Sequence, residues 1–130
     1  MLSRYKMRRG KAPADDPLPD GVRADTRKHT KHFLRPSGEI VDAYLKTPDD
    51  KAWKTFRKEY LALITGRFKA DSTPFDELAE QARTEDVYLG CSCPTDKNPD
   101  ARHCHTMLAL EFMAKRYPDL EVVVPGAGKS

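Results

Sequence analysis

The chain has 130 residues, of which 38% are hydrophobic and 33% charged, and its formal net charge is +3. We therefore expect one small domain, and neither a membrane span nor a secretory signal peptide, because the apolar runs are only a few residues long. The odd number of cysteines, 3, argues against a secreted disulfide scaffold and predicts a cytoplasmic protein whose thiols stay reduced.

The basic residues are concentrated at the start of the chain. Residues 1–35 hold ten Lys and Arg against four Asp, whereas the rest of the chain is mildly acidic. A basic segment of this kind either contacts the phosphates of a nucleic acid or only keeps a strand and a loop solvated. We favour the second interpretation, because no aromatic stacking platform accompanies the basic residues, and keep nucleic acid as an alternative partner.

Two short strands are predicted before the middle of the chain. Weak alternation of apolar residues predicts the first over residues 1–9, and the second is expected over residues 22–26. Residues 11–21 are predicted to form a loop, because three prolines and an Asp-Gly pair interrupt any central strand. Residues 27–39 are predicted to form a long polar loop, and ordered loops of this length often carry function.

The middle of the chain gives the clearest helical signal. A helix is predicted from Thr47 and Pro48, a preferred cap and first helical residue, to Gly66, a typical stop. A second helix is predicted from Thr73 and Pro74, and both helices are expected to pack in the core. The inward faces are predicted to consist of Trp53, Phe56, Tyr60 and Leu63 in the first helix and Phe75, Leu78, Ala79 and Ala82 in the second.

The last third of the chain predicts a strand, a helix and a strand. The strands cover residues 87–91 and 120–124, the helix covers about residues 101–117, and residues 126–130 form a flexible tail. A strand, a helix and a strand over this length form a right-handed crossover between parallel strands. We therefore predict a single α/β domain over residues 1–125, three-layer-like, with a mostly parallel sheet of about four strands flanked by helices.

Cysteine and histidine residues gather at the start of the last predicted helix. Cys91 ends a strand, and Cys104 falls in the first turn of the helix that follows. Ligands of open parallel sheets bind beyond the carboxyl ends of the strands, and the positive end of a helix stabilises a thiolate. The pattern therefore predicts a functional site at this sheet edge. The cluster consists of Cys91, Cys93, His103, Cys104 and His105.

Three interpretations of this cluster compete. In the first, Cys91 or Cys104 is a nucleophile and His105 is the acid or base of a ligand-binding pocket. In the second, the three cysteines and either His103 or His105 bind zinc. In the third, the cysteines pack as small hydrophobic residues. We favour the first and expect metal-free protein, because one residue between Cys91 and Cys93 fits tetrahedral chelation less well than the usual two.

Three segments together resemble a known family. Residues 50–60 read D-K-A-W-K-T-F-R-K-E-Y, and are similar to the D-x-x-W-x-x-F-R-x-x-Y segment of the YeaO-like branch of domain-of-unknown-function family 488. The strand that ends at Cys91, with Cys104 and His105 after a loop, resembles the Cys…Cys-His-Arg element of that family. Residues 25–27 are similar to its Asp-Val-Arg triplet.

The resemblance covers roughly residues 20–115 and implies a small α/β domain, but no activity, because the function of the family is unassigned. Thr106 stands where the family has arginine, which removes a strong anion-binding group from the helix start. The basic residues of the predicted polar loop that are candidates to restore that charge are Lys28, His29, Lys31 and His32. The residues that the resemblance brings to one sheet edge are Asp25, Arg27, Cys91, Cys104 and His105.

We therefore predict that the chain binds a small anionic or nucleotide-like ligand in a Cys/His/Asp/Arg pocket, without a cofactor. Arg27 would clamp the anion, Asp25 would orient Arg27 or a histidine, and cysteine-dependent catalysis is a further hypothesis. Two alternatives from other classes stay open. One is nucleic-acid binding through the basic amino-terminal segment, and the other is a zinc-stabilised interaction domain.

Overall fold

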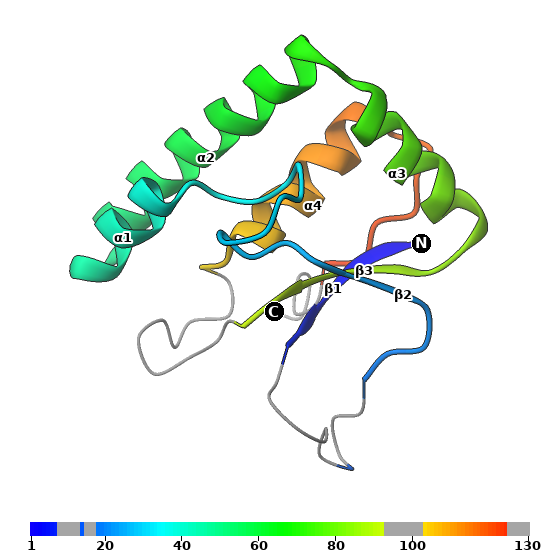
Figure 1. The fold of residues 1–130 in the computed structure, drawn as a ribbon, viewed down its shortest axis with the longest axis horizontal. Coiled ribbons are helices and arrows are strands. Elements are labelled where there is room, and N and C mark those ends of the chain that lie inside the picture. The colour runs from blue at the N-terminus through cyan, green and yellow to red at the C-terminus, as the bar shows by residue number, and fades with distance from the viewer. Residues whose placement is uncertain (8–13, 15–17, 93–102, 125–130) are drawn as a thin grey trace.

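The computed structural model describes residues 1–7, 14, 18–92 and 103–124, so the predicted tail at 126–130 lies outside the described residues. Within these ranges the chain forms an α/β domain (Figure 1). Its elements follow in the order β1 (Leu2–Lys6), β2 (Val22–Asp25), α1 (Gly38–Lys46), α2 (Asp50–Ala70), α3 (Thr73–Thr84), β3 (Val87–Cys91) and α4 (His105–Arg116).

The three strands form a parallel sheet in the order β1-β3-β2. At one end of the sheet Leu2 and Val22 both lie opposite Val87, and at the other end Lys6 lies opposite Cys91. Because all strands run in the same direction, their carboxyl ends meet at one edge. This edge receives the residues that follow β2 and β3.

The predicted last strand is reduced to a single parallel bridge between Leu2 and Val122. The backbone N–H of Leu2 donates to the carbonyl of Glu121, and the N–H of Val123 donates to the carbonyl of Leu2, both at 2.9 Å. The next carbonyl, that of Val123, accepts the Ser3 hydroxyl at 2.7 Å, so a side chain takes the place of the next ladder bond. In its described part the sheet therefore has three strands and one bridge, where about four strands were predicted.

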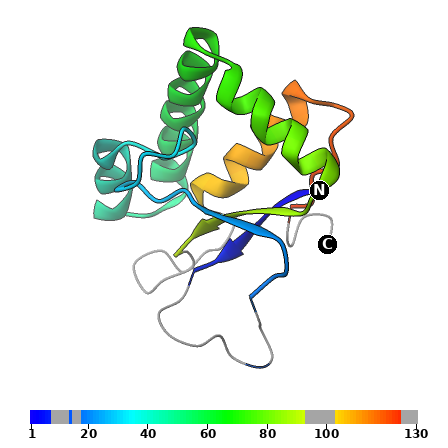
Figure 2. The ribbon, with the colours of Figure 1, turned by 45° about the vertical axis from the view of Figure 1, so that its right-hand side comes forward.

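All four described helices lie on the same side of the sheet (Figures 1 and 2). The described chain thus has two layers, one of helices and one of strands, and the three-layer-like arrangement expected from the sequence was wrong for this part. The core lies between the layers, with Leu2, Val87 and Leu89 from the sheet packed against Ile64 and Phe75 of the helices.

Helix α2 is longer than predicted. Its cap is Asp49 rather than the predicted Thr47, so it begins at Asp50 rather than at Pro48, and it passes Gly66 without ending. The guanidinium of Arg67 donates to two backbone carbonyls of the loop before α1, at 2.9 and 2.7 Å, and Phe68 packs edge-on against an aromatic ring of α3. These tertiary contacts hold the last turn in helical form, so the glycine does not stop the helix.

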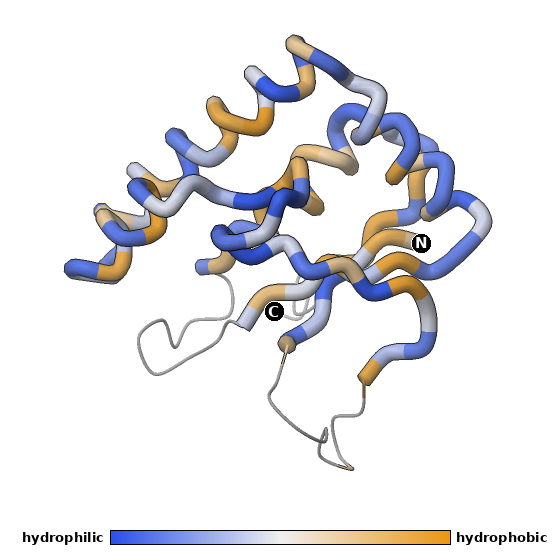
Figure 3. Tube along the Cα trace, viewed as in Figure 1, coloured by the Kyte–Doolittle hydropathy of each residue, from blue (hydrophilic) through white to orange (hydrophobic). Residues whose placement is uncertain are grey.

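The buried face of α2 differs from the prediction at two of the four predicted residues. Phe56, Tyr60 and Ile64 are buried, whereas Trp53 and Leu63 are only half-buried. Figure 3 shows the alternation of hydrophobic and hydrophilic residues along this helix. The inward face of α3 is confirmed, because all four residues that were predicted to face the core are buried.

Helix α1 was not predicted. Its sequence signal is the Ser37 cap, whose hydroxyl accepts the backbone N–H of Ile40 at 3.3 Å, followed by apolar residues at helical spacing. Tyr44 is its buried residue. In the described ranges, no helix combines the length and the apolar character needed to cross a membrane.

Candidate functional site

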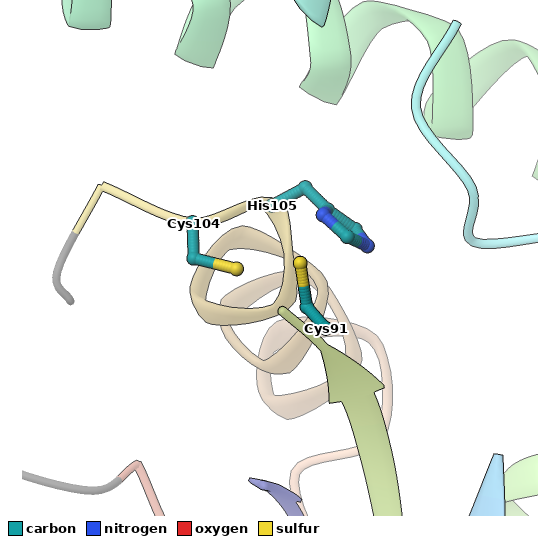
Figure 4. Close-up of side chains that lie close together, drawn as sticks. All are labelled: Cys91, Cys104 and His105. Atoms are coloured by element: carbon teal, nitrogen blue, oxygen red, sulfur yellow. The ribbon is translucent and has the colours of Figure 1, made fainter. Parts of the chain in front are cut away.

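Three side chains meet where β3 ends and α4 begins (Figure 4). Cys91 is the last residue of β3, and His105 is the first residue of α4. Cys104 is the N-cap of α4, with extended backbone, rather than a residue of its first turn as predicted. One potential ligand atom from each side chain lies within 4.8 Å of the other two, and all three side chains are buried.

Thr26 determines which nitrogen of His105 carries the proton. Its hydroxyl oxygen lies 2.9 Å from the carbonyl oxygen of Gly90 and 2.8 Å from Nε2 of His105. A carbonyl only accepts, so the Thr26 hydroxyl donates to Gly90 and accepts from an Nε2–H group. The hydrogen-bond network thus assigns the Nε2–H tautomer to neutral His105, with the lone pair on Nδ1.

The hydroxyl of Thr106 contacts the sulfur of Cys104 at 3.1 Å, and Nε of Arg4 lies 2.8 Å from the same hydroxyl. Thr106 was expected to leave the helix start without an arginine. The structure instead brings a buried guanidinium there from β1. Sequence reasoning missed Arg4, because it is 102 positions from Thr106 and only the packing of β1 against α4 brings the two together.

Asp25, the last residue of β2, forms an ion pair with Arg27, which follows the strand. The carboxylate accepts Nε of Arg27 at 2.9 Å and Nη2 at 2.7 Å. These hydrogen bonds lower the pKa of Asp25 and raise the pKa of Arg27. Asp25 holds one edge of the guanidinium, and the other edge carries the Nη1 group. The pair lies at the same sheet edge as Cys91, because Asp25 pairs with Gly90.

A cavity of about 350 Å³ opens beside these side chains. Its lining combines the thiol and imidazole cluster, a cationic side and a group of aromatic rings. Of the loop residues considered as a source of charge, Lys28 and His29 line the cavity, whereas Lys31 and His32 are not among its lining residues. The principal lining residues are Cys91, Cys104 and His105; Arg27, Lys28 and His29; and Tyr44, Trp53 and Phe56.

The aromatic group holds His103, the other histidine considered for zinc. Its ring stacks on Trp53 with centroids 4.7 Å apart, and its Nδ1 lies 3.1 Å from the hydroxyl of Tyr44. Phe56 stacks on Trp53 at 5.2 Å. His103 therefore lines the cavity as part of an aromatic stack. Among the described residues, it is not in the group of converging ligand atoms.

The described residues offer a metal ion three donors: Cys91, Cys104 and His105. Two thiolates and one imidazole suit zinc, and a set of three protein ligands is typical of zinc sites that keep one position for water or substrate. Cys93, the remaining ligand of the predicted zinc set, lies outside the described residues.

The variant Asp25→Asn is expected to lower the free energy of unfolding near neutral pH by less than ~1 kcal/mol, because both side chains of the ion pair are about one-third exposed. The folded-state pKa of Asp25 is lowered, so the pair stabilises the fold above the unfolded pKa of ~3.9 and loses this contribution as pH falls through the folded-state pKa. Urea unfolding of both proteins across this range measures the difference. A difference that stays constant into acid would contradict the assignment.

A family model described as DUF488-N3a, active DUF488-N3 subclade, matches residues 12–117 of the chain. Comparisons with the curated proteins and with the solved structures give no match. The matched range contains the Asp25–Arg27 pair and the cluster of Cys91, Cys104 and His105. Arg4 lies before it.

Proposed function

The chain belongs to the DUF488 family, and we propose that it binds a small anionic, nucleotide-like ligand in the cavity at the carboxyl edge of its sheet, with cysteine-dependent catalysis. The matched subclade is described as active, which supports a catalytic role. The YeaO-like branch expected from the sequence stays a prediction. A cytoplasmic location, where thiols stay reduced, is part of the proposal.

One observation carries the proposal: a single cavity is lined by two cysteines, three histidines and two cationic side chains, Arg27 and Lys28. The cations attract an anionic group, and the first turn of α4 adds the partial positive charge of a helix start. Aromatic rings on the same cavity supply an apolar surface for the uncharged part of the ligand. A nucleotide has both parts, a charged phosphate and a flat ring.

In this proposal Arg27 binds the anion, and Asp25 orients the guanidinium of Arg27. Asp25 occupies the Nε and Nη2 edge of the guanidinium, which fixes the direction in which the Nη1 edge points. A guanidinium held in this way loses less side-chain freedom when it binds a phosphate oxygen.

The thiols and the histidine supply the chemistry. A thiolate is the nucleophilic form of cysteine, and Cys91 and Cys104 both line the cavity. The Nδ1 lone pair of His105, fixed by the Thr26 hydrogen bond, accepts or returns a proton beside them.

The nucleic-acid alternative stays a prediction, since Arg8, Arg9 and Lys11 lie outside the described residues.

Calorimetric titrations with inorganic phosphate, adenosine monophosphate and adenosine test the proposal. We expect adenosine monophosphate to bind more tightly than adenosine, and Arg27→Ala to weaken its binding by about 10- to 100-fold, the effect of losing a charged hydrogen bond. The matched control is Arg83→Ala, because Arg83 forms the same kind of fork with Asp119 but is not among the cavity residues. Its affinity should equal that of the wild type.

Two outcomes would contradict the proposal: no saturable binding of phosphate or adenosine monophosphate, or equal losses in the Arg27 and Arg83 variants. Elemental analysis of the same samples distinguishes the reactive-thiol pocket from the zinc-stabilised domain. A reactive thiol requires sulfur that is not bound to metal, so we expect far less than one zinc per chain. About one equivalent of zinc, with a melting temperature that falls on chelation, would favour a zinc-stabilised domain instead.

A further inference from the structure

A row of three polar groups leads from the sheet to one of the two cysteines. Nε of Arg4, on β1, lies 2.8 Å from the Thr106 hydroxyl, and this hydroxyl lies 3.1 Å from Sγ of Cys104. All three side chains are buried. Arg4 reaches the start of α4 because β1 packs against that helix.

The chemistry of the end groups fixes the direction of these hydrogen bonds. A guanidinium has five N–H donors and no acceptor, so the oxygen of Thr106 accepts from Arg4. The single hydroxyl proton of Thr106 then points to the sulfur of Cys104. The sulfur accepts a hydrogen bond from a hydroxyl that is itself bound to a cation, and such an arrangement favours negative charge on the sulfur.

We propose that Arg4 and Thr106 hold the sulfur of Cys104 as a thiolate, which makes Cys104 rather than Cys91 the nucleophile; this assignment rests on the cysteine-dependent catalysis proposed above. Arg4 and Thr106 act through Cys104 and are positioning residues. Thr106 serves this role only through its hydroxyl, and serine has the same group.

Other charges around the cluster act on both thiols. The helix start at Cys104 adds a partial positive charge that favours the Cys104 thiolate, whereas Arg27 interacts with Cys91 and favours the Cys91 thiolate. Tyr60, from α2, stays neutral, because burial raises its pKa far above the usual range. On α4, His105 is either neutral or positive, so it does not oppose a thiolate.

One neighbour does oppose ionisation, and it distinguishes the two cysteines. The sulfurs of Cys91 and Cys104 lie within 4.8 Å of each other, so two thiolates would repel each other. The thiol with the stronger donor ionises first and suppresses ionisation of the other. Lys28, His29 and His103 also line the cavity, and their charge, where present, favours either thiolate.

Ultraviolet absorbance of the thiolate against pH tests the assignment without a reagent that must enter the site. In a Cys91→Ser, Cys93→Ser background, Cys104 is the only cysteine left. We expect it to ionise below the value of ~8.5 for ordinary cysteine. Thr106→Val should raise its midpoint by about one pH unit, a tenfold change in the ionisation constant, and Thr106→Ser should restore it.

Arg4→Met tests the cationic end of the row and keeps an unbranched side chain of similar length. It should raise the midpoint of Cys104 ionisation as Thr106→Val does, and a merely structural role of Arg4 would not produce this shift. Melting temperatures show whether each variant is folded. If Thr106→Val does not fold, Arg4→Met and Thr106→Ser decide the result. The assignment is overturned if Cys104 ionises near ~8.5 in the background protein, or if its midpoint is equal in the folded variants. Anion binding, measured separately, can fail or succeed independently of this titration.

Discussion

Replacing Gly21 with alanine is expected to lower the free energy of unfolding by about 3 kcal/mol or more, the cost of backbone strain combined with a backbone clash. Gly21 precedes β2 and has φ +139°, which L residues rarely adopt. A Cβ atom there would lie 2.5 Å from the carbonyl oxygen of Asp86, and that oxygen accepts the N–H of Val22 that aligns β2 with β3. The clash therefore separates the two strands at their first contact.

Thermal unfolding measures this effect, with a melting temperature lowered by about 10 °C for a domain of this size. Gly66→Ala is the matched control, because Gly66 lies in α2 with open space around the position of a Cβ atom. That variant should raise stability by about 0.5–1 kcal/mol, since alanine is the better helix former. If both variants changed stability in the same direction, the structure around Gly21 would be wrong.

Replacing Thr26 with valine is expected to lower the free energy of unfolding by about 2 kcal/mol, the cost of leaving a buried donor without its acceptor. Valine keeps the shape of threonine but removes the hydroxyl that accepts Nε2–H of His105 and donates to Gly90. Gly90 keeps a second bond, because the backbone N–H of Thr26 also donates to its carbonyl at 3.1 Å. The hydrogen bond that the variant loses without replacement is therefore mainly that of the Nε2–H group of His105.

Urea unfolding of Thr26→Val, with Thr26→Ser as the control, measures this contribution. Serine retains the hydroxyl and should keep most of the stability. Nuclear magnetic resonance of the imidazole nitrogens provides a second readout: the wild type and the serine variant should show the Nε2–H tautomer, which the valine variant should lose in part. A valine variant with unchanged tautomer and unchanged stability would contradict the role given to Thr26.

Much of the local structure was predictable from the sequence. The strand 87–91 and the inward face of α3 follow from short-range patterns, because a short apolar run and helical spacing are set by neighbouring residues. The placement of Cys91 at a strand end and of Cys104 at a helix start was predictable for the same reason. Most elements, with the exception of α1, could be recognised from their own residues, so the α/β class and the location of the candidate site followed.

Local patterns misled where distant contacts decide the outcome. Gly66 signals a helix end, yet α2 continues because Arg67 and Phe68 bind elements elsewhere in the chain. The last predicted strand has the strongest β propensity, yet the Ser3 hydroxyl takes a carbonyl that its ladder would use. In both cases a contact between distant residues outweighs a propensity of less than ~1 kcal/mol per residue.

The sequence by itself determined most of the elements, apart from helix α1 and the last predicted strand, and it determined which chemical groups stand at their ends. Only the tertiary structure decided that β3 lies between β1 and β2, since periodicity carries no information about the order of strands in a sheet. That order brings Thr26 to His105, 79 positions away, and the packing of α4 against β1 brings Arg4 to Thr106, 102 positions away. Hydrogen bonds depend on distances of about 3 Å in space rather than on separation along the chain, so the two threonines that direct the protons of the site became visible only in the folded chain.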